Sequence, residues 1–163
     1  MKRTRTLVVA LLFFAAVPAW AQLCGPDVSH SSKSLKQKSP LEINPPGDKA
    51  LVYVILEHGD RYQHKVSVDR RWIGINKGLG DSYFVFAIEP GTHDLCAKAA
   101  VASHLKVNLE AGKTYYFQQV FITTNLVKDQ YQLSEISEED ARTILPKCHR
   151  TVFWEKGAPA PAA

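Results

Sequence analysis

Residue types that are common in catalytic and metal sites follow one another closely in the stretch Glu89-Pro-Gly-Thr-His-Asp-Leu-Cys96. His93 and Asp94 are neighbours on a predicted strand, so their side chains should point to opposite faces and not form a dyad. If Leu95 points inward, His93 does too, and we expect a backbone carbonyl to satisfy its ring. The stretch therefore offers chemistry-bearing residues without a self-contained catalytic pair.

The rest of the sequence supplies no recognisable catalytic or metal motif. It has no G-x-S-x-G elbow, no H-E-x-x-H and no C-x-x-C. A zinc site is expected to cluster cysteine and histidine at short spacings, whereas the histidines are scattered at His30, His58, His64, His93, His104 and His149. We therefore assign no catalytic residue, no metal ligand and no cofactor.

The first 21 residues have the three-part order of a secretory signal peptide. Three basic residues precede an apolar run over 7–17, and Ala19-Trp-Ala21 supplies small residues for cleavage after Ala21. The run is shorter than the roughly 18 to 20 residues that span a bilayer, which disfavours a retained anchor. Gln22 and Leu23 before Cys24 match a lipid-attachment signal poorly. We expect an exported chain, periplasmic or extracellular, with no membrane span after cleavage.

Removal of the signal peptide on export lowers the net positive charge of the chain. Subtracting the three charges of Lys2, Arg3 and Arg5 from the net charge of +4 leaves +1. The remaining basic residues are interspersed with acids and form no stripe, which argues against nucleic-acid binding. In an oxidising compartment the three cysteines Cys24, Cys96 and Cys148 allow one intramolecular disulfide and leave one thiol over, and the residues alone leave the pairing open.

The chain divides into four segments. After the signal peptide, residues 22–48 are polar and broken by prolines, which predicts an extended lead-in that lies along the domain or stays mobile. Ordered structure is expected to begin at Lys49 and to continue to Trp154. The tail over 155–163 is rich in alanine and proline and should be disordered.

Residues 49–154 read as an all-β domain with one short C-terminal helix. Short runs rich in Val, Ile, Tyr, Phe and Thr recur about every ten residues, at 50–56, 65–69, 71–75, 82–88, 92–97, 105–109, 114–122 and 130–136. This pattern is typical of a single immunoglobulin-like or related antiparallel β-sandwich. The run 50–56 is apolar on both faces and predicts a central strand.

The connections carry explicit turn chemistry. Glu89-Pro90-Gly91 fits a type II turn of a central hairpin, and Glu110-Ala-Gly-Lys113 should close another. Ser137 is a good helix N-cap, acids occupy the first turn after it, and Pro146 should end the helix. These acids are thereby explained without a metal or catalytic role.

Four phrases resemble the bacterial domain of unknown function 2846 family: Lys49–Ile55, Val66–Gly74, Ser82–Leu95 and Glu110–Tyr116. The order "V-x-V-D-G-x-x-I-G" followed by "P-G-x-H", with Arg70 at the position of the first glycine, is also similar to the PEGA domain, a small β-module of surface proteins. The resemblance implies an exported or lipid-anchored envelope protein with no established activity, so no catalytic residue is carried over.

The resemblance also bears on the cysteines and on one hairpin. Related exported chains pair Cys-Gly-Pro near the mature start with a cysteine after P-G-x-H, which implies a Cys24–Cys96 disulfide here. The family favours glycine where Arg70 stands, so we expect a longer turn and a less certain register at that hairpin tip.

Aromatic residues are numerous enough to suggest a binding surface. We predict Trp72, Arg70, Arg71 and Tyr83 as ligand-binding residues, because flat rings beside a charged hairpin tip can stack on sugars or peptide side chains. The alternative is that the rings fill the sandwich core. The expected function is a non-enzymatic envelope module that binds a protein or glycan partner. A structural accessory domain of an envelope assembly, and a hydrolase with an unrecognised site, are the alternatives.

Overall fold

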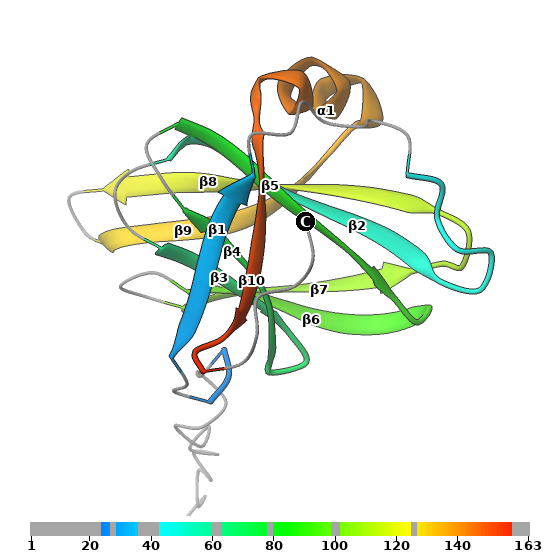
Figure 1. Cartoon of the computed structure of the whole chain (residues 1–163), viewed down its shortest axis with the longest axis horizontal. Coiled ribbons are helices and arrows are strands. Elements are labelled where there is room, and N and C mark those ends of the chain that lie inside the picture. Colours follow the sequence, from blue (N-terminus) through cyan, green and yellow to red (C-terminus); the bar gives the residue numbers. More distant parts are fainter. Residues whose placement is uncertain are drawn as a thin grey trace, which may run out of the picture.

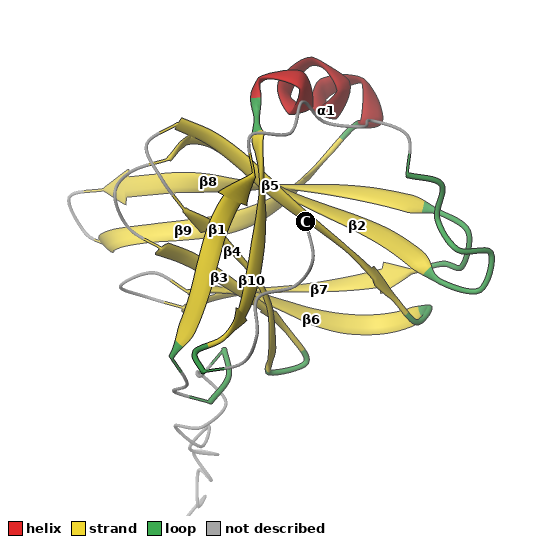
Figure 2. Cartoon of the chain, viewed as in Figure 1, coloured by secondary structure: helices red, strands yellow, loops and turns green. Residues whose placement is uncertain are grey.

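The fold is described from a computed structural model, which covers residues 24–26, 29–35, 43–59, 63–77, 80–98, 102–124 and 127–157. The predicted signal peptide over 1–21 and the tail beyond residue 157 lie outside the described residues. Within the described part, strands form two sheets that stack face to face (Figures 1 and 2).

The larger sheet has six strands. Their order across the sheet is β1 (His30–Leu35), β10 (His149–Glu155), β5 (Gly80–Ile88), β2 (Ala50–Gly59), β8 (Thr114–Thr124) and β9 (Val127–Ile136). The smaller sheet has four strands in the order β4 (Arg71–Lys77), β3 (Gln63–Val68), β6 (Gly91–Lys98) and β7 (Ala102–Leu109). The all-β sandwich is therefore confirmed. Seven of the eight predicted strand segments lie within a strand, and the eighth, 65–69, extends one residue beyond the end of β3.

Most strand pairs are antiparallel, as predicted, but the six-stranded sheet also contains two parallel pairs. β2 pairs in parallel with β8, and β10 with β5. Parallel neighbours need long connections rather than tight turns. Between β2 and β8 the chain passes through β3 and β4 in the smaller sheet, returns to the six-stranded sheet at β5, and passes through the smaller sheet again at β6 and β7.

Two expected hairpins are wrong. β5 pairs with β2 and β10, whereas β6 pairs with β3 and β7, so Glu89–Pro90 carries the chain from one sheet to the other. Residues 110–113 do the same between β7 and β8. Gly91 and Gly112 do adopt positive φ, at 140° and 72°. Turn chemistry reverses the chain locally, but it does not decide which strand the emerging segment pairs with.

The β3–β4 connection is a true hairpin, and it is tighter than expected. Its two turn residues, Asp69 and Arg70, both have positive φ, at 48° and 65°. This is the backbone conformation of a two-residue type I′ turn, which normally favours Asn or Gly. The expected longer turn is therefore wrong, and the irregularity in register lies instead between Val66 and Ser67 inside the hairpin.

The core explains why residues 50–56 are apolar on both faces. Ala50, Val52 and Val54 of β2 point between the sheets and pack with residues such as Phe84, Leu95 and Phe117. The alternate residues of β2 face the other way and pack beneath the C-terminal helix, in a second cluster that contains Leu51, Tyr53, Ile55, Tyr83, Ala141, Ile144, Leu145 and Cys148. Both faces of the central strand are thereby buried.

The predicted helix is confirmed. Helix α1 spans Glu138–Ile144, and the Ser137 hydroxyl accepts a hydrogen bond from the Asp140 backbone N–H at 3.1 Å. A short 3-10 turn, η2 (Leu145–Lys147), contains Pro146 and ends the helical segment. Among the described residues, none of the helices has the length and apolar character required to cross a membrane.

Two strands were not predicted. The expectation that ordered structure begins at Lys49 is wrong, because His30–Leu35 forms β1 and pairs along its whole length with β10. β10 itself runs to Glu155, one residue past the expected domain boundary. β1 reads His-Ser-Ser-Lys-Ser-Leu and has no apolar alternation. Backbone pairing at the sheet edge holds it, which leaves little trace in side-chain pattern.

Candidate functional site

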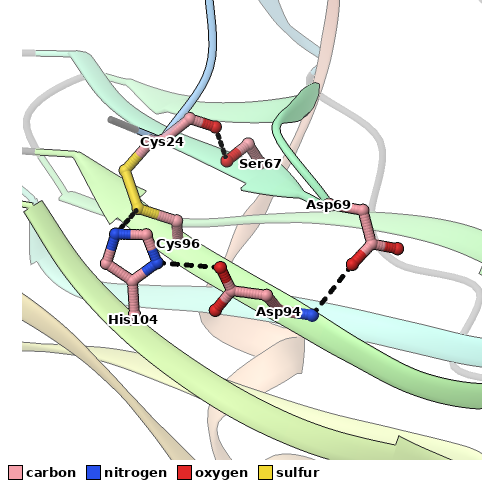
Figure 3. A network of polar contacts seen from close by, with 6 residues as sticks. All are labelled: Cys24, Ser67, Asp69, Asp94, Cys96 and His104. Carbon is pink, nitrogen blue, oxygen red and sulfur yellow. Dashed lines mark hydrogen bonds and ion pairs between the residues drawn. A yellow bond between two sulfur atoms is a disulfide. The ribbon is translucent and has the colours of Figure 1, made fainter. Parts of the chain in front are cut away.

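The outer face of the four-stranded sheet carries a disulfide that ties the N-terminal segment to the fold. Cys24 and Cys96 are bonded, which confirms the pairing implied by the family resemblance. Their side chains are 2% and 1% exposed. Cys96 lies in β6, so the segment Cys24–Pro26 is fixed against the centre of this sheet (Figure 3).

Further contacts hold the Cys24–Pro26 segment against the four-stranded sheet. The Ser67 hydroxyl donates a hydrogen bond to the Cys24 carbonyl, and the Trp72 indole Nε1–H donates to the Pro26 carbonyl at 2.7 Å. A Cβ atom on Gly25 would lie 2.7 Å from the Arg70 carbonyl oxygen and 3.2 Å from the Trp72 ring. Only glycine allows so close an approach, so Cys-Gly-Pro serves as a docking segment.

The predicted binding residues do not form one surface. Tyr83 is 1% exposed and stacks on Tyr53 beneath the helix, so its assignment as a ligand-binding residue is wrong. Its neighbour Phe84 points the other way, between the sheets. Because both faces of β5 are covered at this point, the alternation of side chains along the strand could not show that Tyr83 is buried. Arg70 and Arg71 are exposed at the hairpin tip.

Trp72 is half-buried rather than openly exposed. Besides its hydrogen bond to Pro26, its ring has the Lys65 and Lys98 ammonium groups 5.6 Å and 5.8 Å from its centroid. Cations at this distance from an indole ring are attracted to its π face. The contacts observed for Trp72 thus fix the docking segment and order two lysines.

His93 and Asp94 take separate partners, as expected. His93 Nδ1 lies 2.7 Å from a carboxylate oxygen of Asp69, and His93 Nε2 lies 2.9 Å from the carbonyl oxygen of Glu89. The predicted backbone carbonyl is thereby confirmed. Partial burial of Asp69 acts to raise its pKa, but hydrogen bonds from the Asp94 N–H and from His93 outweigh burial and hold that pKa below its ordinary value.

Asp94 instead contacts a histidine that the sequence did not single out. One carboxylate oxygen lies 2.9 Å from His104 Nδ1, and His104 Nε2 lies 3.4 Å from Cys96 Sγ (Figure 3). In the β6–β7 hairpin Cys96 pairs directly with His104. The register of that hairpin would have indicated this contact, but the residues of its turn give no unique register.

A groove opens along one side of the sandwich, between β7 and β9. Its volume is about 380 Å³. Leu105, Val107, Tyr115 and Leu133 provide apolar walls, and polar residues of β7 and β9 such as Lys106, Asn108, Gln132, Ser134 and Glu135 line its rims. β7 and β9 are the last strands of their sheets in the described structure, so each has a sheet neighbour on one side only.

Cys148 is the free cysteine of the described residues, and its thiol is in an environment that makes it unreactive. Its side chain is buried beneath the helix, 3.5 Å from the Ile144 carbonyl. Burial, with smaller contributions from Asp81 and Glu57, raises its pKa to about 12. A thiolate is the reactive form of cysteine, so this thiol stays neutral and unreactive in the folded protein.

Comparison with known proteins adds little. No family model and no curated protein matches the sequence. Among solved structures, the N-terminal domain of AlgF from P. aeruginosa is similar at 21% identity, over 55% of this chain and 96% of that chain, with a TM-score of 0.33. That score is too low to support an argument about fold or function, and the family resemblance stays a prediction.

Proposed function

We propose that this chain is an exported, non-enzymatic module of the bacterial cell envelope that binds an extended segment of a protein partner. The single observation that carries the proposal is the groove between β7 and β9, which is bounded by an edge strand of each sheet. The signal-peptide pattern and a disulfide support export, because disulfides persist in oxidising compartments.

The groove suits an extended peptide in two ways. Edge strands present unpaired backbone N–H and C=O groups, which can hydrogen-bond an added strand. The half-buried side chains of Leu105, Val107 and Tyr115 can receive alternate side chains of such a strand. A volume of about 380 Å³ falls in the range of ligand pockets.

A glycan fits the groove less well. Sugar rings stack on exposed flat aromatic faces, but Phe117 is fully buried at the base of the groove. The Tyr115 hydroxyl is already engaged, since it accepts a hydrogen bond from the Glu110 backbone N–H at 3.0 Å. The aromatic lining thus acts chiefly as core, and backbone pairing is left as the means of recognition.

Binding without catalysis is favoured by where the reactive groups lie. The His93 ring is engaged at both nitrogens, Cys24 and Cys96 are joined, and the Cys148 thiol is buried. None of these groups lines the groove. The proposal therefore assigns recognition to the groove and stability to the polar network on the other side of the smaller sheet.

The test selects random extended peptides against the mature, oxidised chain by phage display and measures their affinity by calorimetry. Val107→Lys places a charged chain in the groove, whereas Lys147→Gln alters an exposed residue that does not line the groove and serves as a control. We expect selected peptides to bind the wild type and Lys147→Gln equally and Val107→Lys at least tenfold more weakly, with circular dichroism unchanged. Failure to select any peptide above background, or equal binding to Val107→Lys, would refute the groove as the site.

A further inference from the structure

We propose that reduction of the Cys24–Cys96 disulfide creates a zinc site, in which the two cysteine sulfurs and His104 Nε2 are the protein ligands and Asp94 orients the histidine. These three donor atoms already lie within 4.8 Å of one another. The proposal is independent of the groove between β7 and β9, because it concerns the outer face of the smaller sheet.

The spacing of the donor atoms matches zinc coordination. Zn–S and Zn–N bonds of about 2.3 and 2.0 Å at a tetrahedral angle place sulfur and nitrogen about 3.5 Å apart. His104 Nε2 and Cys96 Sγ lie 3.4 Å apart. The bonded sulfurs are closer together than two zinc ligands would be, and breaking their bond allows Cys24 Sγ to move outward while Cys96 and His104 stay in register on β6 and β7.

Asp94 prepares the histidine for a metal. An ionised carboxylate only accepts hydrogen bonds, so its contact with Nδ1 at 2.9 Å fixes the proton on that nitrogen. The Nε2 lone pair then faces the sulfur atoms (Figure 3). A carboxylate behind a histidine in this way is the usual outer partner of a zinc ligand.

The charge balance also favours a cation. The second oxygen of Asp94, Oδ1, is buried and has no hydrogen-bond partner in the described structure. A buried carboxylate oxygen without a partner is costly. A divalent cation on His104 would lie close enough to offset part of this cost. The His104 side chain is about one-third exposed, at 32%, so a metal ion can reach Nε2 from solvent.

The chemistry is a two-electron reduction followed by metal binding. A dithiol reductant transfers two electrons and two protons, the Cys24–Cys96 bond breaks into two thiols, and the reductant becomes a disulfide. Zn²⁺ then displaces both thiol protons and binds two thiolates and neutral His104. Two thiolates neutralise the ion, and water completes a four-coordinate Cys₂His site. In the oxidised protein the sulfurs carry no charge and cannot serve as thiolate ligands.

The experiment compares the oxidised chain with the same chain reduced by a phosphine under anaerobic conditions. Each is incubated with Zn²⁺ alone, gel-filtered and assayed for metal, and Co²⁺ replaces Zn²⁺ for spectroscopy. We expect one zinc per reduced chain, none at this site in the oxidised chain, and thiolate-to-cobalt charge transfer with tetrahedral d–d bands. Reduced chain that binds no zinc, or oxidised chain that binds equally well, would overturn the proposal.

Matched variants test the ligand set. We expect His104→Ala to lower zinc affinity at least about 100-fold and Asp94→Asn to lower it about 10- to 100-fold, whereas Cys148→Ser should leave it unchanged. Thermal denaturation covers the case in which reduction weakens the fold: zinc should raise the melting temperature of the reduced wild type but not of reduced His104→Ala. Equal affinity in His104→Ala, or a reduced chain unfolded with and without zinc, would count against the site.

Discussion

The Cys24–Cys96 disulfide should supply a large part of the stability of this domain. The bonded residues are 72 positions apart in sequence. In the chain-entropy model, closing a loop of this length in the unfolded chain raises the free energy of unfolding by about 4 kcal/mol at 25 °C. Native domains are stable by only about 5 to 15 kcal/mol. We therefore expect Cys24→Ala/Cys96→Ala to remain folded only marginally.

The assay is urea unfolding, followed by tryptophan fluorescence and circular dichroism, of the oxidised wild type and the double variant. With a slope of about 2 kcal/mol per molar urea, a loss of 4 kcal/mol lowers the midpoint by about 2 M. Trp72→Phe is the control, because it removes the hydrogen bond to Pro26 but keeps the disulfide. Its cost should be about 1 kcal/mol. A double variant within about 1 kcal/mol of the wild type would refute the reasoning.

Three further predictions test other features. Arg70→Gly relieves a positive φ of 65° and should raise the free energy of unfolding by about 0.5 to 1 kcal/mol. Arg71→Gly changes a residue of the adjoining strand β4 and should lower the free energy of unfolding by a similar amount. The urea midpoints of the two variants and the wild type measure both effects. The Cys148 thiol should resist Ellman's reagent at neutral pH until denaturant is added. Because its folded pKa of about 12 exceeds the ordinary 9.0, its contribution to stability is complete below pH 9 and is lost between about pH 9 and 12, which urea titrations across that range measure. Gly74→Ala places a Cβ 2.2 Å from the Phe84 ring and should cost about 1 to 3 kcal/mol, and a thermal melt matching the wild type would contradict that packing.

The strands were predictable where side chains carry the information. β2 shows this most clearly, because both of its faces are buried, one between the sheets and one beneath α1. The helix was predictable because Ser137 and Pro146 act through local backbone chemistry. In both cases the physical cause lies within a few consecutive residues.

The parts that could not be predicted depend on partners far away in sequence. β1 and β10 hold each other at a sheet edge through backbone hydrogen bonds, which do not depend on apolar alternation. Glu89–Pro90 has the residues of a hairpin turn, yet the strands on either side of it enter different sheets.

The prediction of the binding residues failed for the same reason. Tyr83 and Trp72 are each the second residue of a predicted strand, but α1 and η2 cover Tyr83, whereas the Cys24–Pro26 segment contacts Trp72. The contact of His104 with Cys96 depends on the register of β6 against β7. Neither the covering segments nor that register can be read from the residues around these side chains.

The position of the disulfide also determines how the domain carries mechanical load. β1 and β10 are antiparallel, with His30 opposite Glu155, so tension applied to those two residues would open their pairs one after another. Cys24 precedes β1 and is bonded to Cys96 in the other sheet. Tension arriving upstream of Cys24 therefore enters through β6 and bypasses β1. The bond therefore protects the β1–β10 pairing from being opened by such tension, and it does so only while the two cysteines are oxidised.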